Sequence, residues 1–198
     1  MKESRKENCC QMEANEALPE YKRHTYADYC RWDDDERWEL IDGVPYAMSA
    51  PTWEHQGILV ELAGQIREYL KGKPCKVFVA PFDVRLNADG YDDTVVQPDI
   101  VVICDRSKLS GTGCVGSPDM IIEVLSPSTA AHDRIRKFGL YMRYGVREYW
   151  IVDPETKSVS AHILDSGRYY TSAYAETDTA SVQVLEGCTI DLSEVFEE

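Results

Sequence analysis

Two short apolar segments, residues 95–103 and 119–125, place the strongest constraint on how this chain can fold. Each is rich in β-branched residues and bounded by turn-forming residues, which is typical of a buried β-strand. Each also carries a carboxylate, Asp99 or Glu123, where the pattern otherwise places apolar side chains. A buried carboxylate without a partner is costly, so two such strands side by side predict that both carboxylates bind one cation. The alternative is that one carboxylate forms an ion pair with an arginine.

The residues beside Asp99 and Glu123 refine this expectation. Pro98 cannot donate to a sheet ladder, so it marks a strand start or an irregularity just before Asp99. Side chains alternate along a strand, so Gln97 is expected on the face of Asp99, as an accessory residue of the site. Hard cations such as Mg²⁺ prefer carboxylate oxygens, and a metal-bound water is a better nucleophile at neutral pH. The pattern therefore favours a metal-dependent hydrolase.

A cationic group for this site is expected from a helix at about residues 130–144. Asp133, Lys137, Tyr141 and Tyr144 fall on one face of that helix. If the helix packs back over the strands, Lys137 can reach the carboxylates and stabilise charge that develops on a phosphate. The alternative is a surface lysine that pairs with Asp133 at i,i+4.

Two further residues are candidates on weaker grounds. Glu39 lies in an apolar run next to Asp42-Gly43, a dipeptide that predicts a β-hairpin between residues 38–41 and 44–48. Taken alone, Glu39 is an exposed strand acid. His55 opens a predicted helix over residues 54–71, on nearly the same stripe as its apolar residues. Taken alone, His55 is a helix-terminal or core histidine.

The remaining pattern predicts one domain of the α/β or α+β class, with one helix before and one after the central strands. Residues 1–20 are polar and predict a flexible tail, and residues 21–198 form the domain. A Thr-x-x-Asp capping box at Thr25 predicts a short helix. Other strands are expected at residues 76–86, 148–153, 159–164, 169–174 and 181–185, with a short terminal element at 192–196.

The net charge of −14 argues mildly against a protein that coats nucleic acid. Residues 134–147 nevertheless hold five basic residues and no acidic one, so this segment is either a solvated helix face or a local phosphate-facing patch. In the second case Arg134 and Arg136 are the candidate nucleic-acid-binding residues.

Compartment and cysteine chemistry are also predicted from the composition. No apolar run approaches the roughly 18 residues of a membrane span, and the charged start has no apolar segment behind it. A cytoplasmic protein without a membrane partner is expected. Seven scattered cysteines without Cys-x-x-Cys spacing argue against a zinc site, and reduced thiols are expected.

Taken together, these motifs resemble the Uma2 family, and they occur in the family's order over roughly residues 20–195. The resemblance is carried by Trp-Glu-Leu-Ile-Asp-Gly at 38–43, Ser-Ala-Pro at 49–51 with Glu-His at 54–55, Gln-Pro-Asp at 97–99, the segment 117–129, the segment 137–141 and the segment 145–154. It implies a restriction-endonuclease-like fold, a mixed sheet flanked by helices, and a PD-(D/E)xK-type site that hydrolyses phosphodiesters with Mg²⁺, or with Mn²⁺ as an alternative.

Residue by residue, the resemblance assigns Asp99 to the PD element and Glu123 to the second acidic position, both as metal ligands. The wider superfamily places a lysine two residues after the second acid, where this chain has Leu125. Lys137 from the following helix is the expected substitute. Glu39 resembles the extra N-terminal acid of the superfamily, and His55 matches a family motif position as an accessory residue. DNA is the implied partner, and a homodimer is expected because many nucleases dimerise to cut two strands.

Three function classes follow from this reading. The first is a Mg²⁺-dependent DNA endonuclease, favoured by Asp99, Glu123 and Lys137. The second is a catalytically inactive protein that keeps the nuclease fold for nucleic-acid binding or assembly, favoured by the strong acidity and by Leu125. The third is another small phosphodiester hydrolase. Metal-dependent cleavage of DNA separates the first class from the second.

Overall fold

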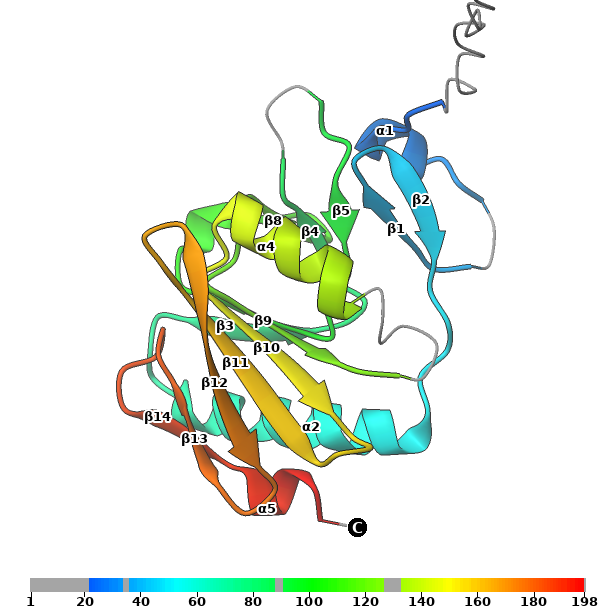
Figure 1. Ribbon diagram of the computed structural model, residues 1–198. Coiled ribbons are helices and arrows are strands. Elements are labelled where there is room, and N and C mark those ends of the chain that lie inside the picture. Colours follow the sequence, from blue (N-terminus) through cyan, green and yellow to red (C-terminus); the bar gives the residue numbers. More distant parts are fainter. Residues whose placement is uncertain (1–21, 34–35, 88–90, 127–132, 198) are drawn as a thin grey trace, which may run out of the picture.

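Two strands, β9 (Met120–Val124) and β10 (Glu148–Asp153), pair in parallel in the middle of a six-stranded sheet, which we call the central sheet. The computed structural model describes residues 22–33, 36–87, 91–126 and 133–197, except for the side chains of Asp133 and Arg134. The predicted tail therefore lies outside the described residues. Parallel neighbours need a crossover, and the chain between β9 and β10 supplies one by crossing a face of the sheet. The helix α4 (Phe138–Tyr144) of this crossover lies over the sheet (Figure 1), and Lys137, the residue before it, contacts Glu123 of β9.

The central sheet has the strand order β12-β11-β10-β9-β6-β3, and every pair except β9–β10 is antiparallel. A second, N-terminal sheet has the order β2-β1-β5-β4-β8-β7. The further strands of the central sheet are β3 (Lys76–Val79), β6 (Ile100–Ile103), β11 (Ser158–Asp165) and β12 (Arg168–Ala175). Those of the N-terminal sheet are β1 (Trp38–Ile41), β2 (Val44–Ala47), β4 (Asp83–Arg85), β5 (Val95–Val96), β7 (Leu109–Ser110) and β8 (Gly113–Val115).

Local signals place most helices and turns. The expected capping box at Thr25 is present and opens α1 (Tyr26–Tyr29). Asp42 and Gly43 both have positive φ and close the predicted β1–β2 hairpin. Thr52 caps α2 by accepting from the backbone N–H of His55. The helical segments are α1, α2 (Trp53–Tyr69), the 3₁₀-helix Arg106–Lys108, the π-helical turn Asp133–Lys137, α4 (Phe138–Tyr144) and α5 (Leu192–Val195), and the strands β13 (Thr179–Val182) and β14 (Cys188–Asp191) form a C-terminal ribbon.

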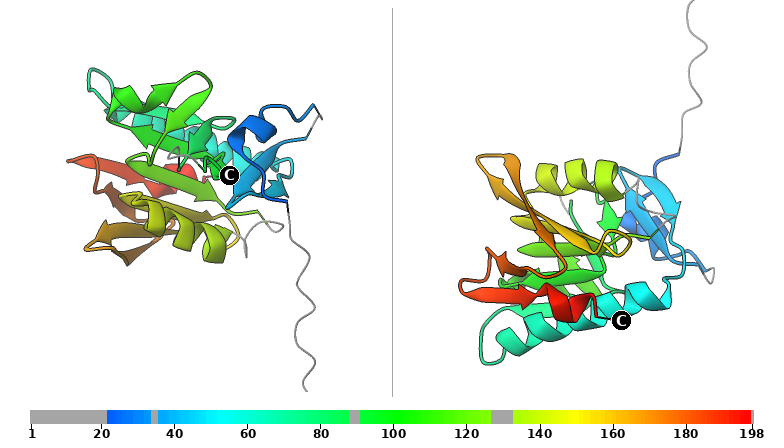
Figure 2. Two further views of the ribbon diagram at one scale, coloured as in Figure 1. Left: turned by 90° about the horizontal axis from the view of Figure 1, so that it is seen from above. Right: turned by 60° about the horizontal axis from the view of Figure 1, so that its bottom comes forward.

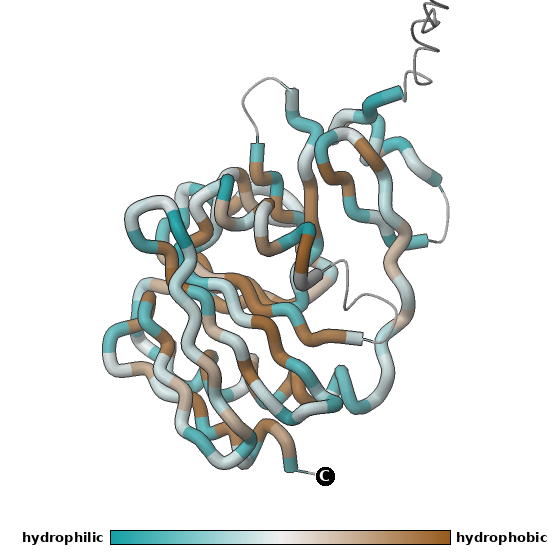
Figure 3. The backbone as a smooth tube through the Cα atoms, in the orientation of Figure 1, coloured by the Kyte–Doolittle hydropathy of each residue, from teal (hydrophilic) through white to brown (hydrophobic). Residues whose placement is uncertain are grey.

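The central sheet is buried on both faces. Figures 1 and 2 show α2 and the C-terminal ribbon on one face and α4 on the other. The side chains of β6 alternate between these layers, with Ile100 and Val102 in the core under α2 and Val101 and Ile103 in the core under α4. Figure 3 shows hydrophobic segments along the strands at the centre and hydrophilic loops at the margins. This arrangement confirms the expected mixed sheet flanked by helices.

Two expected strands are each divided between the two sheets. Residues 95–103 form β5 and β6, which are interrupted at the proline before Asp99. Residues 76–86 form β3 and β4, which are separated by a cis Ala80–Pro81 bond. Proline has no N–H for the ladder, so each interruption falls where pairing cannot continue. The expected irregularity at Pro98 is therefore a full interruption, and each segment predicted as one strand is two; the strands β7, β8 and β14 were missed.

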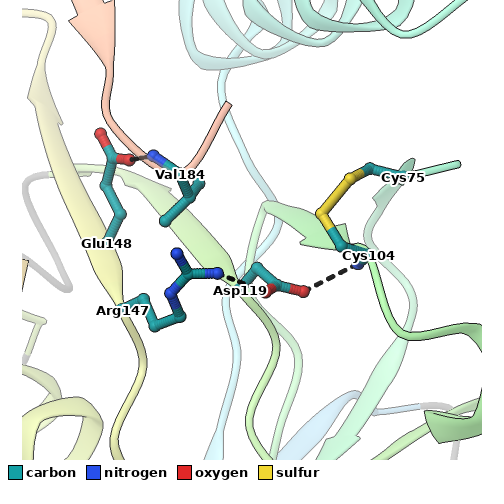
Figure 4. Close-up of a disulfide and its surroundings, with 6 residues drawn as sticks. All are labelled: Cys75, Cys104, Asp119, Arg147, Glu148 and Val184. Carbon is teal, nitrogen blue, oxygen red and sulfur yellow. Dashed lines mark hydrogen bonds and ion pairs between the residues drawn. A yellow bond between two sulfur atoms is a disulfide. The ribbon is translucent and has the colours of Figure 1, made fainter. Parts of the chain in front are cut away.

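The cysteine prediction was also wrong, because Cys75 and Cys104 form a disulfide. They flank the paired residues Lys76 and Ile103 of β3 and β6, so the antiparallel register sets them opposite each other. Figure 4 shows Asp119 beside this link, where it accepts from the backbone N–H of Cys104 at 2.7 Å. Cys30, Cys114 and Cys188 are free thiols, and Cys9 and Cys10 lie outside the described residues.

Within the described ranges, no helix has both the length and the apolar character that a bilayer crossing requires.

Candidate active site

The two carboxylates of the central strands lie at one end of the β6–β9 pair. Ile100 is paired with Ile122, and continuing this antiparallel register by one residue sets Asp99 opposite Glu123. The backbone N–H of Val124 donates to Asp99 Oδ2 at 2.8 Å, which holds that carboxylate against β9. Both residues line a pocket of about 400 Å³, in which Glu123 is buried and 17 % of the Asp99 side chain is exposed.

Lys137 reaches this pocket from the crossover segment. Its Nζ lies 2.9 Å from Glu123 Oε1 and 3.0 Å from Glu39 Oε1, and the residue is only 3 % exposed. This burial rules out the alternative of a surface lysine. One helical turn later, the hydroxyl of Tyr141 donates to the same Glu123 oxygen at 2.7 Å. Burial, and then the nearby carboxylates, raise the pKa of Tyr141 well above its ordinary value, so the phenol keeps its proton.

Glu39 is not the exposed strand acid that its local sequence indicates. It is buried, and besides Lys137 its Oε1 accepts from the backbone N–H of Gln97 at 2.9 Å. Strand β1 belongs to the N-terminal sheet, so this carboxylate joins the two sheets at the pocket. A hairpin pattern alone cannot show that another sheet covers its outer face.

His55 contacts Asp99 from the opposite layer. Its Nε2 lies 3.2 Å from Asp99 Oδ2, and the histidine is buried in the first turn of α2. A helix N-terminus carries partial positive charge, which favours a carboxylate at this place. His55 therefore lies at the helix terminus, as predicted, and its side chain also contacts Asp99 in the pocket.

Gln97 is the centre of a network that sequence reasoning detected only in part. Its Oε1 accepts from Arg37 Nη2 at 2.8 Å and Nε at 3.1 Å. Its Nε2 donates to the Tyr29 hydroxyl at 2.8 Å and to Asp83 Oδ1 at 3.0 Å. Arg37 also lines the pocket. It was missed, although its place two residues before Glu39 puts the two side chains on one face of an extended chain.

The candidate nucleic-acid-binding residues lie on the same crossover segment. Arg136 is exposed, and its guanidinium stands over the ring of Tyr46, 4.5 Å from the centroid. Tyr46 lines the pocket, so Arg136 is at its rim. The side chain of Arg134 lies outside the described residues.

Among the residues that the structure describes, the lining of the pocket is rich in charge. Glu39, Asp99 and Glu123 are acidic, Lys137 and Arg37 are basic, and His55 contacts Asp99. The residues that the structure describes contain no group of three or more His, Cys, Asp or Glu placed to hold a metal. Asp99 and Glu123 offer carboxylate oxygens, which are the protein donors that a hard ion such as Mg²⁺ takes beside several waters.

A second, larger groove of about 930 Å³ lies between α2, the β10–β11 turn and the C-terminal segment. Its lining includes one basic residue, Lys157, and six acidic ones, Glu54, Glu61, Asp153, Glu155, Glu194 and Glu197. Phosphates would be repelled by this surface. The basic residues Arg37 and Arg136 lie instead at the smaller pocket, in its lining and at its rim.

Comparisons with known proteins agree with this architecture. A crystal structure described as a "putative nuclease belonging to DUF820" from Anabaena variabilis superposes with a TM-score of 0.71 at 18 % identity, over 87 % of this chain and 97 % of the other, and so shares the fold. The uncharacterized protein slr1290 of Synechocystis sp. is 30 % identical over 163 residues, 80 % of this chain and 84 % of the relative. The uncharacterized protein sll1609 of the same organism is 27 % identical over 134 residues, 65 % of this chain and 74 % of the relative.

The family comparison covers nearly the whole described domain. The model of the Uma2 family, described as "Putative restriction endonuclease", matches residues 26–193. That range includes the segments that carry Glu39, Asp99, Glu123 and Lys137. The chain therefore has the restriction-endonuclease-like fold and belongs to the Uma2 family.

Proposed function

We propose that this protein is a metal-dependent endonuclease that hydrolyses phosphodiester bonds of DNA in the pocket of Asp99, Glu123 and Lys137. One observation carries the proposal: two carboxylates from neighbouring strands and a buried ammonium from the crossover segment line a single pocket. Hydrolysis of a phosphodiester needs a directed water and a cation near the developing negative charge. Membership of a family described in terms of restriction endonucleases supports the same reaction class.

Asp99 and Glu123 are the residues that would hold Mg²⁺ or Mn²⁺. When bound, such an ion lowers the pKa of a coordinated water and neutralises charge on the phosphate. The chain's own residues have separate tasks. His55 and the Val124 N–H keep the Asp99 carboxylate in place, and the Tyr141 hydroxyl does the same for Glu123.

Lys137 supplies the positive charge that the wider superfamily obtains from a lysine at the position of Leu125. Leu125 is buried in the core under α4, where it packs against apolar residues. The parallel β9–β10 crossover carries the following helix over the same face of the sheet, so a lysine from that helix reaches Glu123. Glu39 accepts from the same ammonium and thereby aligns it. In the reaction this ammonium stabilises the additional charge on the phosphate oxygens.

A second candidate function is a non-catalytic member of the nuclease fold. The same contacts favour it, because a lysine bound to two buried carboxylates also fits a structural ion-pair triad. The overall charge of −14 and the acidic groove also favour binding partners other than nucleic acid. The two candidates differ in whether the pocket turns over substrate.

The test is cleavage of supercoiled and linear DNA by the purified protein in Mg²⁺, in Mn²⁺ and in EDTA. Asp99→Ala should abolish cleavage, and Asp165→Ala, at the exposed end of β11, should not. Wild-type protein that leaves DNA intact in both metals, or Asp99→Ala protein that cleaves like wild type, would overturn the catalytic proposal.

We also propose a homodimer, in which two pockets cut two strands. Sedimentation of the same preparation tests this oligomeric state.

A further inference from the structure

Arg37 differs from the other charged residues of the pocket because its guanidinium is held by a neutral partner. Over the part of the chain that the structure describes, its side chain donates to the Gln97 amide oxygen and to no carboxylate. This is unexpected beside Glu39, Asp99 and Glu123, since an arginine near carboxylates usually forms an ion pair. Among the described residues, no carboxylate contacts this guanidinium, and the arginine lines the pocket.

The orientation of the Gln97 amide is determined by its surroundings. Asp83 can only accept, so the nitrogen end of the amide must face Asp83 and Tyr29. Tyr29 accepts from that nitrogen and donates its own proton to Asp83 Oδ1 at 3.2 Å. Burial is the main cause that raises the pKa of Tyr29, so the hydroxyl keeps this proton. The oxygen end of the amide is thereby left for Arg37.

The contact with Gln97 leaves part of the arginine available. A guanidinium has five N–H donors in a rigid plane, and the amide oxygen takes one from Nε and one from Nη2. The remaining edge, with Nη1, has the fork geometry that matches two oxygens of a phosphate. Arg37 is half-buried, so this edge is held in one orientation and not free to follow a mobile ligand.

The charge balance assigns Arg37 a role in substrate binding. A divalent cation held by Asp99 and Glu123 would offset two of the three lining carboxylates, so the basic Arg37 and Lys137 would outweigh the third, which suits a phosphodiester. Loss of Arg37 would remove one of these positive charges and weaken the attraction of the loaded pocket for a phosphate. Lys137 is less suited to holding the ground-state phosphate, because its ammonium is already in contact with Glu39 and Glu123.

We propose that Arg37, aligned by Gln97, is a phosphate-binding residue that holds the DNA backbone beside the bond to be cut. This inference rests on the proposed function for the position of the cut. It assigns the inner side of the DNA path to Arg37 and the outer rim to Arg136, which stands over Tyr46. Arg37 is a binding residue, so its loss reduces affinity for the substrate more than the rate of the chemical step.

The experiment measures binding of a fluorescent DNA duplex by anisotropy over a range of NaCl concentrations. Asp99→Asn protein in Mg²⁺ is used so that the duplex stays intact while Glu123 still offers the cation a carboxylate. Adding Arg37→Ala should weaken binding about tenfold and flatten the log–log salt dependence by about one unit, the loss of one phosphate contact. Adding Arg37→Lys should keep the slope and lose part of the affinity, because a point charge replaces a fork. Arg67→Ala, on the exposed end of α2, is the matched control and should change neither quantity.

The readouts separate this inference from the proposed function. Thermal unfolding of each variant shows whether it is folded, and Arg37→Lys keeps the test valid if Arg37→Ala is not. An unchanged slope in folded Arg37→Ala protein, or no duplex binding by the parent, overturns the inference. Arg37-dependent binding by a wild-type protein that never cleaves supports the phosphate site and refutes the nuclease. In an active enzyme, Arg37→Ala should raise KM with little change in kcat.

Discussion

Removal of the Lys137 ammonium should affect stability and catalysis in different ways. Nζ lies 2.9 Å from Glu123 and 3.0 Å from Glu39, in a place that solvent barely reaches. At these distances each attraction is about 5.5 kcal/mol for an effective dielectric constant of about 20. Desolvation offsets much of it, and breaking a buried pair by removing one partner costs about 3–5 kcal/mol. Lys137→Ala should therefore lose that much unfolding free energy in metal-free buffer.

The chemical contribution is separated by a second substitution. Glu39→Gln in the Lys137→Ala background removes one of the two buried negative charges and should recover part of the lost stability. The cleavage rate of both proteins should be below that of wild type by a factor on the order of 10² or more, since neither has the lysine ammonium beside the phosphate. Lys137→Arg should restore cleavage only in part, because a planar fork replaces a compact charge.

The assays are urea unfolding in EDTA and in Mg²⁺, turnover of supercoiled plasmid, and duplex affinity. Mg²⁺ should stabilise Lys137→Ala more than wild type, because the carboxylates then lack their internal cation. Duplex affinity should change little. Lys71→Ala, an exposed lysine on the same chain, controls for loss of a surface charge. A folded Lys137→Ala protein that cleaves at the wild-type rate would refute the catalytic role of the ammonium and favour the structural triad.

Three other outcomes are expected. Asp99→Asn should abolish cleavage yet preserve or raise stability in EDTA, since it relieves carboxylate repulsion; ready unfolding in urea would contradict a shared site. Burial lowers the pKa of His162 from its ordinary value of 6.5. Below about pH 6.5 the unfolded chain therefore gains a proton that the folded chain does not. The unfolding free energy then falls by up to about 1.4 kcal/mol for each unit by which the pH is lowered. His162→Phe should remove this acid loss in unfolding measured at pH 7 and 5.5, and an unchanged slope would assign it elsewhere. Reduction of Cys75–Cys104, which are separated by 29 residues, should lower the unfolding free energy by about 3.5 kcal/mol, and a Cys75→Ala/Cys104→Ala protein insensitive to reductant is the control.

Local sequence patterns predicted the elements that depend on neighbouring residues. The hairpin at Asp42-Gly43, the capping box at Thr25 and the apolar stripe of α2 all formed as expected, because turn geometry and helical period involve only a few adjacent positions. The carboxylates Asp99 and Glu123 were also recognisable, because an acid in an apolar strand is costly unless it has a function.

Tertiary structure decided how the side chains of the pocket are paired. Glu39 has the local pattern of an exposed acid but is buried, and its carboxylate contacts the Gln97 N–H and Lys137, which come from distant segments. Arg37 gave only the signal of its spacing from Glu39, since its partner Gln97 is distant in sequence and the orientation of that amide depends on Tyr29 and Asp83. The helix face and the family resemblance both pointed to Lys137, but its burial depends on the path of the β9–β10 crossover, which the sequence left open. Such contacts join segments from different sheets and layers, and a pattern read along one segment holds no information about which layer will cover it.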